Sequence, residues 1–265
     1  MCLAVLIDAD NAPRTALREI MAEVAVYGTP TIKRIYGDWT MPNMDSWKPL
    51  LLEHAITPIQ QYSYTTGKNS TDSALIIDAM DILYTGHCDG FVLVSSDSDF
   101  TRLATRLREA GMKVYGMGER KTPQPFIVAC DRFVYIEVIR AAAASKSLAG
   151  GQTPVKQPSA KKSTNKRPET AAPQSVSPSS HGAVPEQFVD LIAESVEDLA
   201  DEDGYAYLGD LGSLLLKKQP DFDSRNFGFS KLSKLVFALE DTFEVDERRN
   251  ANNLSTQVYL RNRRK

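Results

Sequence analysis

The sequence contains few of the residues that bind zinc or form nucleophilic triads. Its 265 residues include three histidines and three cysteines, which are scattered and form no C-x-x-C pattern. This scarcity argues against a zinc site and against a histidine-based triad. Isolated cysteines are typical of free thiols in a reducing compartment. We therefore expect unpaired thiols at Cys2, Cys88 and Cys130.

Long apolar runs are also missing. No stretch approaches the ~20 apolar residues that a membrane span requires. The first ten residues, MCLAVLIDAD, have no basic region before their short apolar run and a charge directly after it. This pattern indicates a buried strand rather than a signal peptide. Together these features predict a cytoplasmic protein with no membrane partner.

The remaining composition is that of a globular protein with a linker. Hydrophobic residues make up 42% of the chain and charged residues 25%, which are ordinary fractions. Between residues 141 and 184, Ser, Pro, Ala, Thr, Gln and Lys predominate, and six basic side chains accompany one acidic side chain. This composition predicts a disordered basic linker. We expect one domain at 1–140, the linker at 141–184 and a second domain at 185–262.

Strand and helix patterns alternate along the first domain. Such alternation predicts an α/β fold with a mostly parallel sheet. The runs 3–7 and 91–95 are almost wholly apolar, so we expect both at the centre of the sheet, buried on both faces. The other expected strands are 31–37, 56–61, 113–118 and 133–137, and the expected helices are 13–26, 46–54, 71–85 and 99–111.

Carboxylates follow both of these central strands. Asp8 and Asp10 end the first run, and Asp97 and Asp99 end the second. Residues i and i+2 of an extended segment point the same way, and parallel strands end at one edge of their sheet. Carboxylates that converge there repel one another unless a divalent cation offsets their charge. Helix capping by the same residues is the alternative explanation for each pair.

A further acidic residue, Asp72, falls in the first turn of the expected helix 71–85. The helix dipole favours a carboxylate there whether or not a metal is bound. Asp78 lies six residues later, about 240° round the helix, so we expect it to be solvated or structural. Lys68, just before this helix, is a candidate for contact with a phosphate, although exposed lysines are commonly only solvated.

The second domain shows three helical patterns followed by two strands around the loop NANN. This order predicts a winged helix-turn-helix. The domain is acidic overall, which is unfavourable for a general phosphate binder. Its basic side chains are candidates for one RNA-binding face, or they are simply solvated. They are Lys217, Lys218, Arg225, Lys231 and Lys234.

Three ordered motifs resemble the NYN domain family of PIN-like nucleases over residues 1–140. The motifs are LIDADN, KNSTDSALIIDAM and VLVSSDSDFTRLATRLREAGMKVYGMG. The resemblance implies a Rossmann-like PIN fold and metal-dependent cleavage of RNA phosphodiester bonds with Mg²⁺ or Mn²⁺. It also implies that Asn11 orients water or a carboxylate, while Ser96 replaces a common glycine. The metal-binding catalytic residues that it implies are Asp8, Asp72, Asp97 and Asp99.

The second domain resembles the LOTUS, or OST-HTH, domain. The segments EQFVDLIAESVEDL, GFSKLSKLV and FEVDERR carry this likeness. The resemblance implies binding of RNA, including G-rich folded RNA such as G-quadruplexes, or binding of a protein partner. The sequence leaves open which of these applies and whether the protein forms a homodimer.

These features favour an endoribonuclease whose LOTUS domain recruits RNA to the catalytic domain. A non-catalytic RNA-binding regulatory protein is the alternative, and retention of all four carboxylates counts against it. A phosphatase of the haloacid dehalogenase type is a third reading, because DADN is similar to a D-x-D nucleophile motif. Ala12 after the motif, and Thr101 where a second aspartate would be expected, both argue against this reading.

Overall fold

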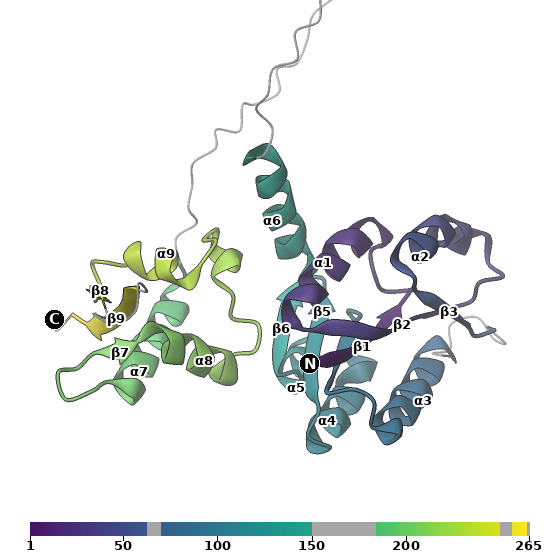
Figure 1. Cartoon of the computed structure of the whole chain (residues 1–265), viewed down its shortest axis with the longest axis horizontal. Coiled ribbons are helices and arrows are strands. Elements are labelled where there is room, and N and C mark those ends of the chain that lie inside the picture. Colours follow the sequence, from purple (N-terminus) through teal and green to yellow (C-terminus); the bar gives the residue numbers. More distant parts are fainter. Residues whose placement is uncertain (63–69, 150–183, 250–255, 264–265) are drawn as a thin grey trace, which may run out of the picture.

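The computed structural model describes residues 1–62, 70–149, 184–249 and 256–263. They form two folded units (Figure 1). We call residues 1–149 the N-terminal unit and residues 184–263 the C-terminal unit. Among the described helices, none has the length and apolar character needed to cross a bilayer.

The N-terminal unit is built on a six-stranded parallel sheet of order β3-β2-β1-β4-β5-β6. This confirms the predicted α/β fold, and β1 and β4 are adjacent at its centre as expected. Their uninterrupted apolar sequences suit burial on both faces. The strands are β1 Cys2–Asp8, β2 Thr29–Gly37, β3 Thr57–Gln60, β4 Gly90–Val94, β5 Lys113–Gly118 and β6 Arg132–Tyr135.

Helices cover both faces of this sheet. One face packs on α1, η2, α2 and α6, and the other packs on α3, α4 and α5. Side chains of β1 alternate between the two cores: Val5 and Ile7 enter the first, and Ala4 and Leu6 enter the second. The helices are η1 Arg14–Ala16, α1 Leu17–Tyr27, η2 Pro42–Trp47, α2 Lys48–His54, α3 Ser70–Thr85, η3 Ser98–Phe100, α4 Thr101–Glu109, α5 Gln124–Ala129 and α6 Ile136–Ala149.

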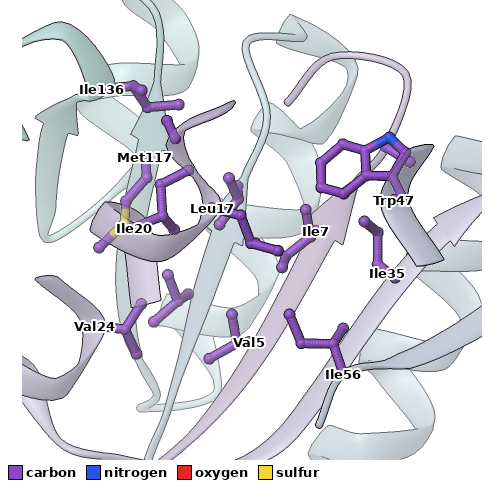
Figure 2. Close-up of a cluster of buried hydrophobic side chains, with 14 of the residues drawn as sticks. Val5, Ile7, Leu17, Ile20, Val24, Ile35, Trp47, Ile56, Met117 and Ile136 are labelled. Atoms are coloured by element: carbon purple, nitrogen blue, oxygen red, sulfur yellow. The ribbon is translucent and has the colours of Figure 1, made fainter. Parts of the chain in front are cut away.

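The core on the α1 face joins residues that are distant in the sequence. Figure 2 shows Leu17 of α1 beside Ile7 and Ile20 of α1 beside Met117, with Trp47 of η2 close to Ile35 of β2. Each fully buried aliphatic side chain of this kind contributes roughly 1.5–3 kcal/mol to folding. This packing fixes α1 and the carboxyl end of β1 relative to each other.

Helix α6 differs from the sequence prediction. We expected strand structure through residue 137 and a disordered linker from residue 141, but β6 ends at Tyr135 and α6 continues to Ala149. Residues 141–144 are four consecutive alanines, and alanine has the highest helix propensity of all residue types. This explains why the chain is helical where we expected the linker to begin. The rest of the predicted linker, 150–183, lies outside the described residues.

The C-terminal unit combines helices with a small antiparallel sheet of order β7-β9-β8. The expected three helices and terminal hairpin are present, and β7 adds a short strand that the sequence analysis missed. One core holds the unit together, centred on Ile192, Leu211, Leu235 and Phe243. The elements are α7 Glu186–Leu199, β7 Ala206–Tyr207, α8 Leu208–Lys218, η4 Ser224–Phe227, α9 Leu232–Phe237, β8 Phe243–Arg249 and β9 Thr256–Asn262.

Candidate functional site

The carboxyl ends of β1 and β4 meet at one point of the sheet edge. The two strands pair in parallel, and Ile7 lies opposite Val94 at the last paired position. Asp8 and Ser95 follow directly, so the chain delivers polar side chains from both strands to the same place. This is the edge at which open parallel sheets bind their ligands.

Three carboxylates come together there. One oxygen from each of Asp72, Asp97 and Asp99 lies within 4.8 Å of the others. Asp72 comes from the first turn of α3, whereas Asp97 and Asp99 come from the segment between β4 and α4. Carboxylate oxygens are the ligands that Mg²⁺ and Mn²⁺ prefer. The donor set therefore fits a hard divalent cation.

The segment after β4 also shows the helix capping that we considered as the alternative. Oδ1 of Asp97 accepts a 2.9 Å hydrogen bond from the backbone N–H of Asp99, at the start of η3. This bond fixes the Asp97 carboxylate beside that of Asp99. Capping and membership of the acidic cluster are therefore compatible roles for one side chain.

Asp72 is the buried member of the cluster, with 8% of its surface exposed. Burial, together with the nearby charges of Asp8, Asp97 and Asp99, raises the pKa of the Asp72 carboxyl to about 6. Its negative charge is therefore held at a cost that a bound cation would relieve. Raised carboxyl pKa values of this kind are common at functional sites.

Asp8 is placed differently from the other three. Its carboxylate is fully buried. Oδ1 accepts the backbone N–H groups of Asp10 and Asn11, and Oδ2 accepts the side-chain amide of Asn11 at 2.8 Å. Burial raises the pKa of Asp8, although these hydrogen bonds oppose the effect. Among the described residues, Asp8 lies beside the three-carboxylate group and outside it, held by the asparagine that the sequence analysis singled out.

Ser95 is a residue of this site that the sequence analysis did not identify. Its hydroxyl donates a 2.8 Å hydrogen bond to Oδ2 of Asp8 and accepts the backbone N–H of Asp97 at 3.0 Å. Only 2% of Ser95 is exposed. The sole sequence signal is its position as the first polar residue after an apolar strand, and many serines share that position.

The described members of the predicted RNA-binding set all belong to the C-terminal unit. Lys68 is outside the described residues. The four lysines of the C-terminal unit are exposed on or beside α8 and α9: Lys217, Lys218, Lys231 and Lys234. Of these, Lys218 forms a 2.6 Å ion pair with Asp198. The guanidinium of Arg225 is held by Glu23 and Asp223 and does not face solvent as those lysines do.

Asp78 has the structural role that we expected as one of two possibilities. Its carboxylate accepts hydrogen bonds from Arg34 and from the hydroxyl of Tyr36, both on β2. It therefore ties α3 to the sheet.

Comparison with known protein families identifies both units. The NYN domain family matches residues 3–137, which is half of the chain. The chain belongs to the NYN domain family. The OST-HTH/LOTUS domain matches residues 183–255, so the architecture suspected from the sequence is confirmed. NYN domains are usually metal-dependent ribonucleases, and OST-HTH/LOTUS domains bind RNA.

Two solved structures are similar to parts of this chain. A protein of unknown function from Vibrio parahaemolyticus is 24% identical, with a TM-score of 0.43, and the match covers 51% of this chain and 92% of that one. An uncharacterized protein from Nitrosomonas europaea, solved by NMR, is 34% identical with a TM-score of 0.29, covering 38% of this chain and 94% of that one. No curated protein matches the chain.

Proposed function

We propose that this NYN-family protein is a metal-dependent endoribonuclease that cleaves RNA phosphodiester bonds at the edge formed by β1 and β4. The observation that carries the proposal is the convergence of Asp72, Asp97 and Asp99, whose ligand oxygens lie within 4.8 Å of one another. An acidic cluster at the ligand-binding edge of a parallel sheet suits a cation that in turn meets a phosphate.

In this proposal Asp72, Asp97 and Asp99 hold Mg²⁺ or Mn²⁺, and Asp8 completes the acidic wall from the end of β1. The cation, when bound, lowers the pKa of a water and offsets negative charge that develops on the phosphate. Asp97 is oriented by its own cap to the Asp99 amide. Asn11 and Ser95 hold the Asp8 carboxylate in place through its Oδ2 atom.

The C-terminal unit would recruit the RNA. Lys217 and Lys218 end α8, while Lys231 and Lys234 lie on or beside α9, and all four are exposed. Tethering a binding unit to a catalytic unit raises the local RNA concentration, which reaches the mM range for short flexible tethers. A protein partner of the C-terminal unit, a homodimer and a cytoplasmic location stay predictions from the sequence.

The test is incubation of the full chain with labelled single-stranded, duplex and G-quadruplex RNAs. Mg²⁺, Mn²⁺ and chelator are compared in parallel reactions. We expect cleavage of at least one RNA with a metal and none with chelator. RNA binding without cleavage at every metal concentration would instead support the non-catalytic regulatory reading.

A further inference from the structure

A short segment of the C-terminal unit contacts the last strand of the N-terminal unit. This segment comprises residues 220–226, between α8 and η4 and into η4, and we call it the 220–226 segment. Figure 1 shows a loop of the C-terminal unit reaching toward β6. Contacts between α6 and η4 accompany it. The two units therefore touch through described residues, independently of the chain that joins them.

The contact begins on the backbone. The N–H of Phe133 in β6 donates a 2.8 Å hydrogen bond to the carbonyl oxygen of Pro220. Two residues further along β6, the hydroxyl of Tyr135 donates a 2.7 Å hydrogen bond to Oδ2 of Asp221. Segment and strand thus run past each other with both backbone and side-chain contacts.

A network of charges extends the contact to α1. The guanidinium of Arg225 binds Glu23 through two parallel hydrogen bonds of 2.9 and 2.7 Å. The same guanidinium binds Asp223, and Arg132 of β6 donates to Asp223 at 3.2 Å. Arg132 also lies over the ring of Tyr27, 5.1 Å from its centroid. Groups of opposite charge therefore meet across the contact at two places, Arg225 with Glu23 and Arg132 with Asp223.

These charges are largely removed from water. Side-chain exposure is 11% for Glu23, 8% for Asp223 and 21% for Arg225. Burial alone would raise the pKa of Glu23 and Asp223, but the hydrogen bonds and charge of Arg225 hold both below their ordinary values. Removing one partner from a buried network leaves an uncompensated charge, which is strongly unfavourable. The contact is therefore selective for these partners, and a fork between guanidinium and carboxylate is its strongest element.

A weak contact suffices between tethered units. Short flexible tethers give effective concentrations on the order of 1 mM. An interface with an intrinsic Kd of about 0.1 mM would then be closed in roughly nine-tenths of the molecules. A network of a few buried ion pairs and hydrogen bonds is sufficient for an affinity of this order.

We propose that the 220–226 segment is a docking segment, which holds the C-terminal unit against β6 and α1 of the same chain in solution. Arg225 binds Glu23 in this state, and its guanidinium is not available to a phosphate. The docked state is a property of the protein without RNA or metal, so it does not rest on the proposed nuclease activity.

The backbone N–H of Phe133 reports the docked state directly, since its acceptor belongs to the other unit. The N–H of Asp131, bonded to the carbonyl of Val114 inside the N-terminal unit, is the matched control. Amide exchange is measured by NMR on the full chain without RNA or metal. We expect protection at both amides in the wild-type protein. In Glu23→Gln and in Arg225→Gln, exchange at Phe133 should become at least about tenfold faster while that at Asp131 is unchanged.

Glu53→Gln, which alters an exposed carboxylate on α2, is the control variant and should leave both amides unchanged. Small-angle scattering of the same samples should show a larger radius of gyration only for the two docking variants. Rapid exchange at Phe133 in the wild-type protein would overturn the proposal without reference to any variant. Equal Phe133 protection in Glu23→Gln and wild type, with an unchanged radius, would also overturn it.

Discussion

The hydroxyl of Ser95 donates a 2.8 Å hydrogen bond to the carboxylate of Asp8, 87 positions away in the sequence. The bond joins the carboxyl ends of β1 and β4. The same hydroxyl accepts the N–H of Asp97. One buried oxygen thus links the carboxylate at the end of β1 to the backbone that carries the acidic cluster.

Ser95→Ala should therefore destabilise the protein and weaken the site. The change leaves the Asp97 N–H without this acceptor and removes one donor from Asp8, and an unsatisfied buried polar group costs about 1–3 kcal/mol. Chemical denaturation measures the loss. Ser195→Ala is the matched control, because that buried hydroxyl only donates back to Leu191 within α7, and we expect a cost below about 1 kcal/mol. Equal costs for both variants would show that the Ser95 link is not important.

Asp97→Asn should abolish metal-dependent RNA cleavage while leaving the fold intact. Loss of a group that merely orients a metal ligand costs about 10–100-fold, so loss of a ligand should cost at least about 100-fold. Cleavage rates and circular dichroism are the measurements. Asp81→Asn, at an exposed position on α3, should cleave at the wild-type rate. An undiminished rate in Asp97→Asn would show that the proposed site is wrong.

Asp72→Asn should stabilise the metal-free protein at neutral pH. The pKa of Asp72 is raised to about 6, so its contribution to stability is complete below about pH 4 and is lost as the pH rises through 6. At pH 7.5, in chelator, we expect the free energy of unfolding of the variant to exceed that of wild type by about 1–2 kcal/mol. The difference should disappear near pH 4, and added Mg²⁺ should reduce it. A constant difference from pH 4 to 8 would contradict this assignment.

Gly118→Ala should be the more damaging of two glycine substitutions. At Gly118, a Cβ would lie 2.6 Å from both the carbonyl oxygen of Ser95 and Oγ1 of Thr122, in the packed end of β5. Overpacking of this kind costs about 1–3 kcal/mol or more. Gly111 has φ +82° and open space around its Cβ position, so Gly111→Ala should cost only the strain of a left-handed backbone, about 1–2 kcal/mol. Thermal denaturation measures the loss of stability in each variant. A smaller loss for Gly118→Ala than for Gly111→Ala would show that the residues around the end of β5 can move to accommodate a methyl group.

Local sequence predicts the architecture of the N-terminal unit well. The apolar runs of β1 and β4 require burial on both faces, and this requirement places them at the centre of the sheet. The positions of Asp97 and Asp99 after β4 then follow from the alternation of an extended chain. The alanines of α6 indicate a helix equally locally, but the composition of the residues that follow them predicts disorder.

The finer features depend on contacts between distant residues. The sequence does not reveal that Ser95 reaches Asp8, because that contact needs the register of two strands. Nor does it reveal that Arg225 binds Glu23, 202 positions away. A basic residue that will meet a carboxylate looks the same, in sequence, as one that will meet a phosphate.

The hydrogen bond between Phe133 and Pro220 has a consequence for self-association. Strand β6 is the outer strand of its sheet on one side, and such strands present unpaired N–H and C=O groups on which another chain can pair and aggregate. The carbonyl oxygen of Pro220 accepts the N–H of Phe133. Proline itself has no backbone N–H, so Pro220 cannot donate a hydrogen bond to a further strand. The docked segment therefore covers this margin of the sheet without extending it, and undocked molecules would expose a surface prone to aggregation.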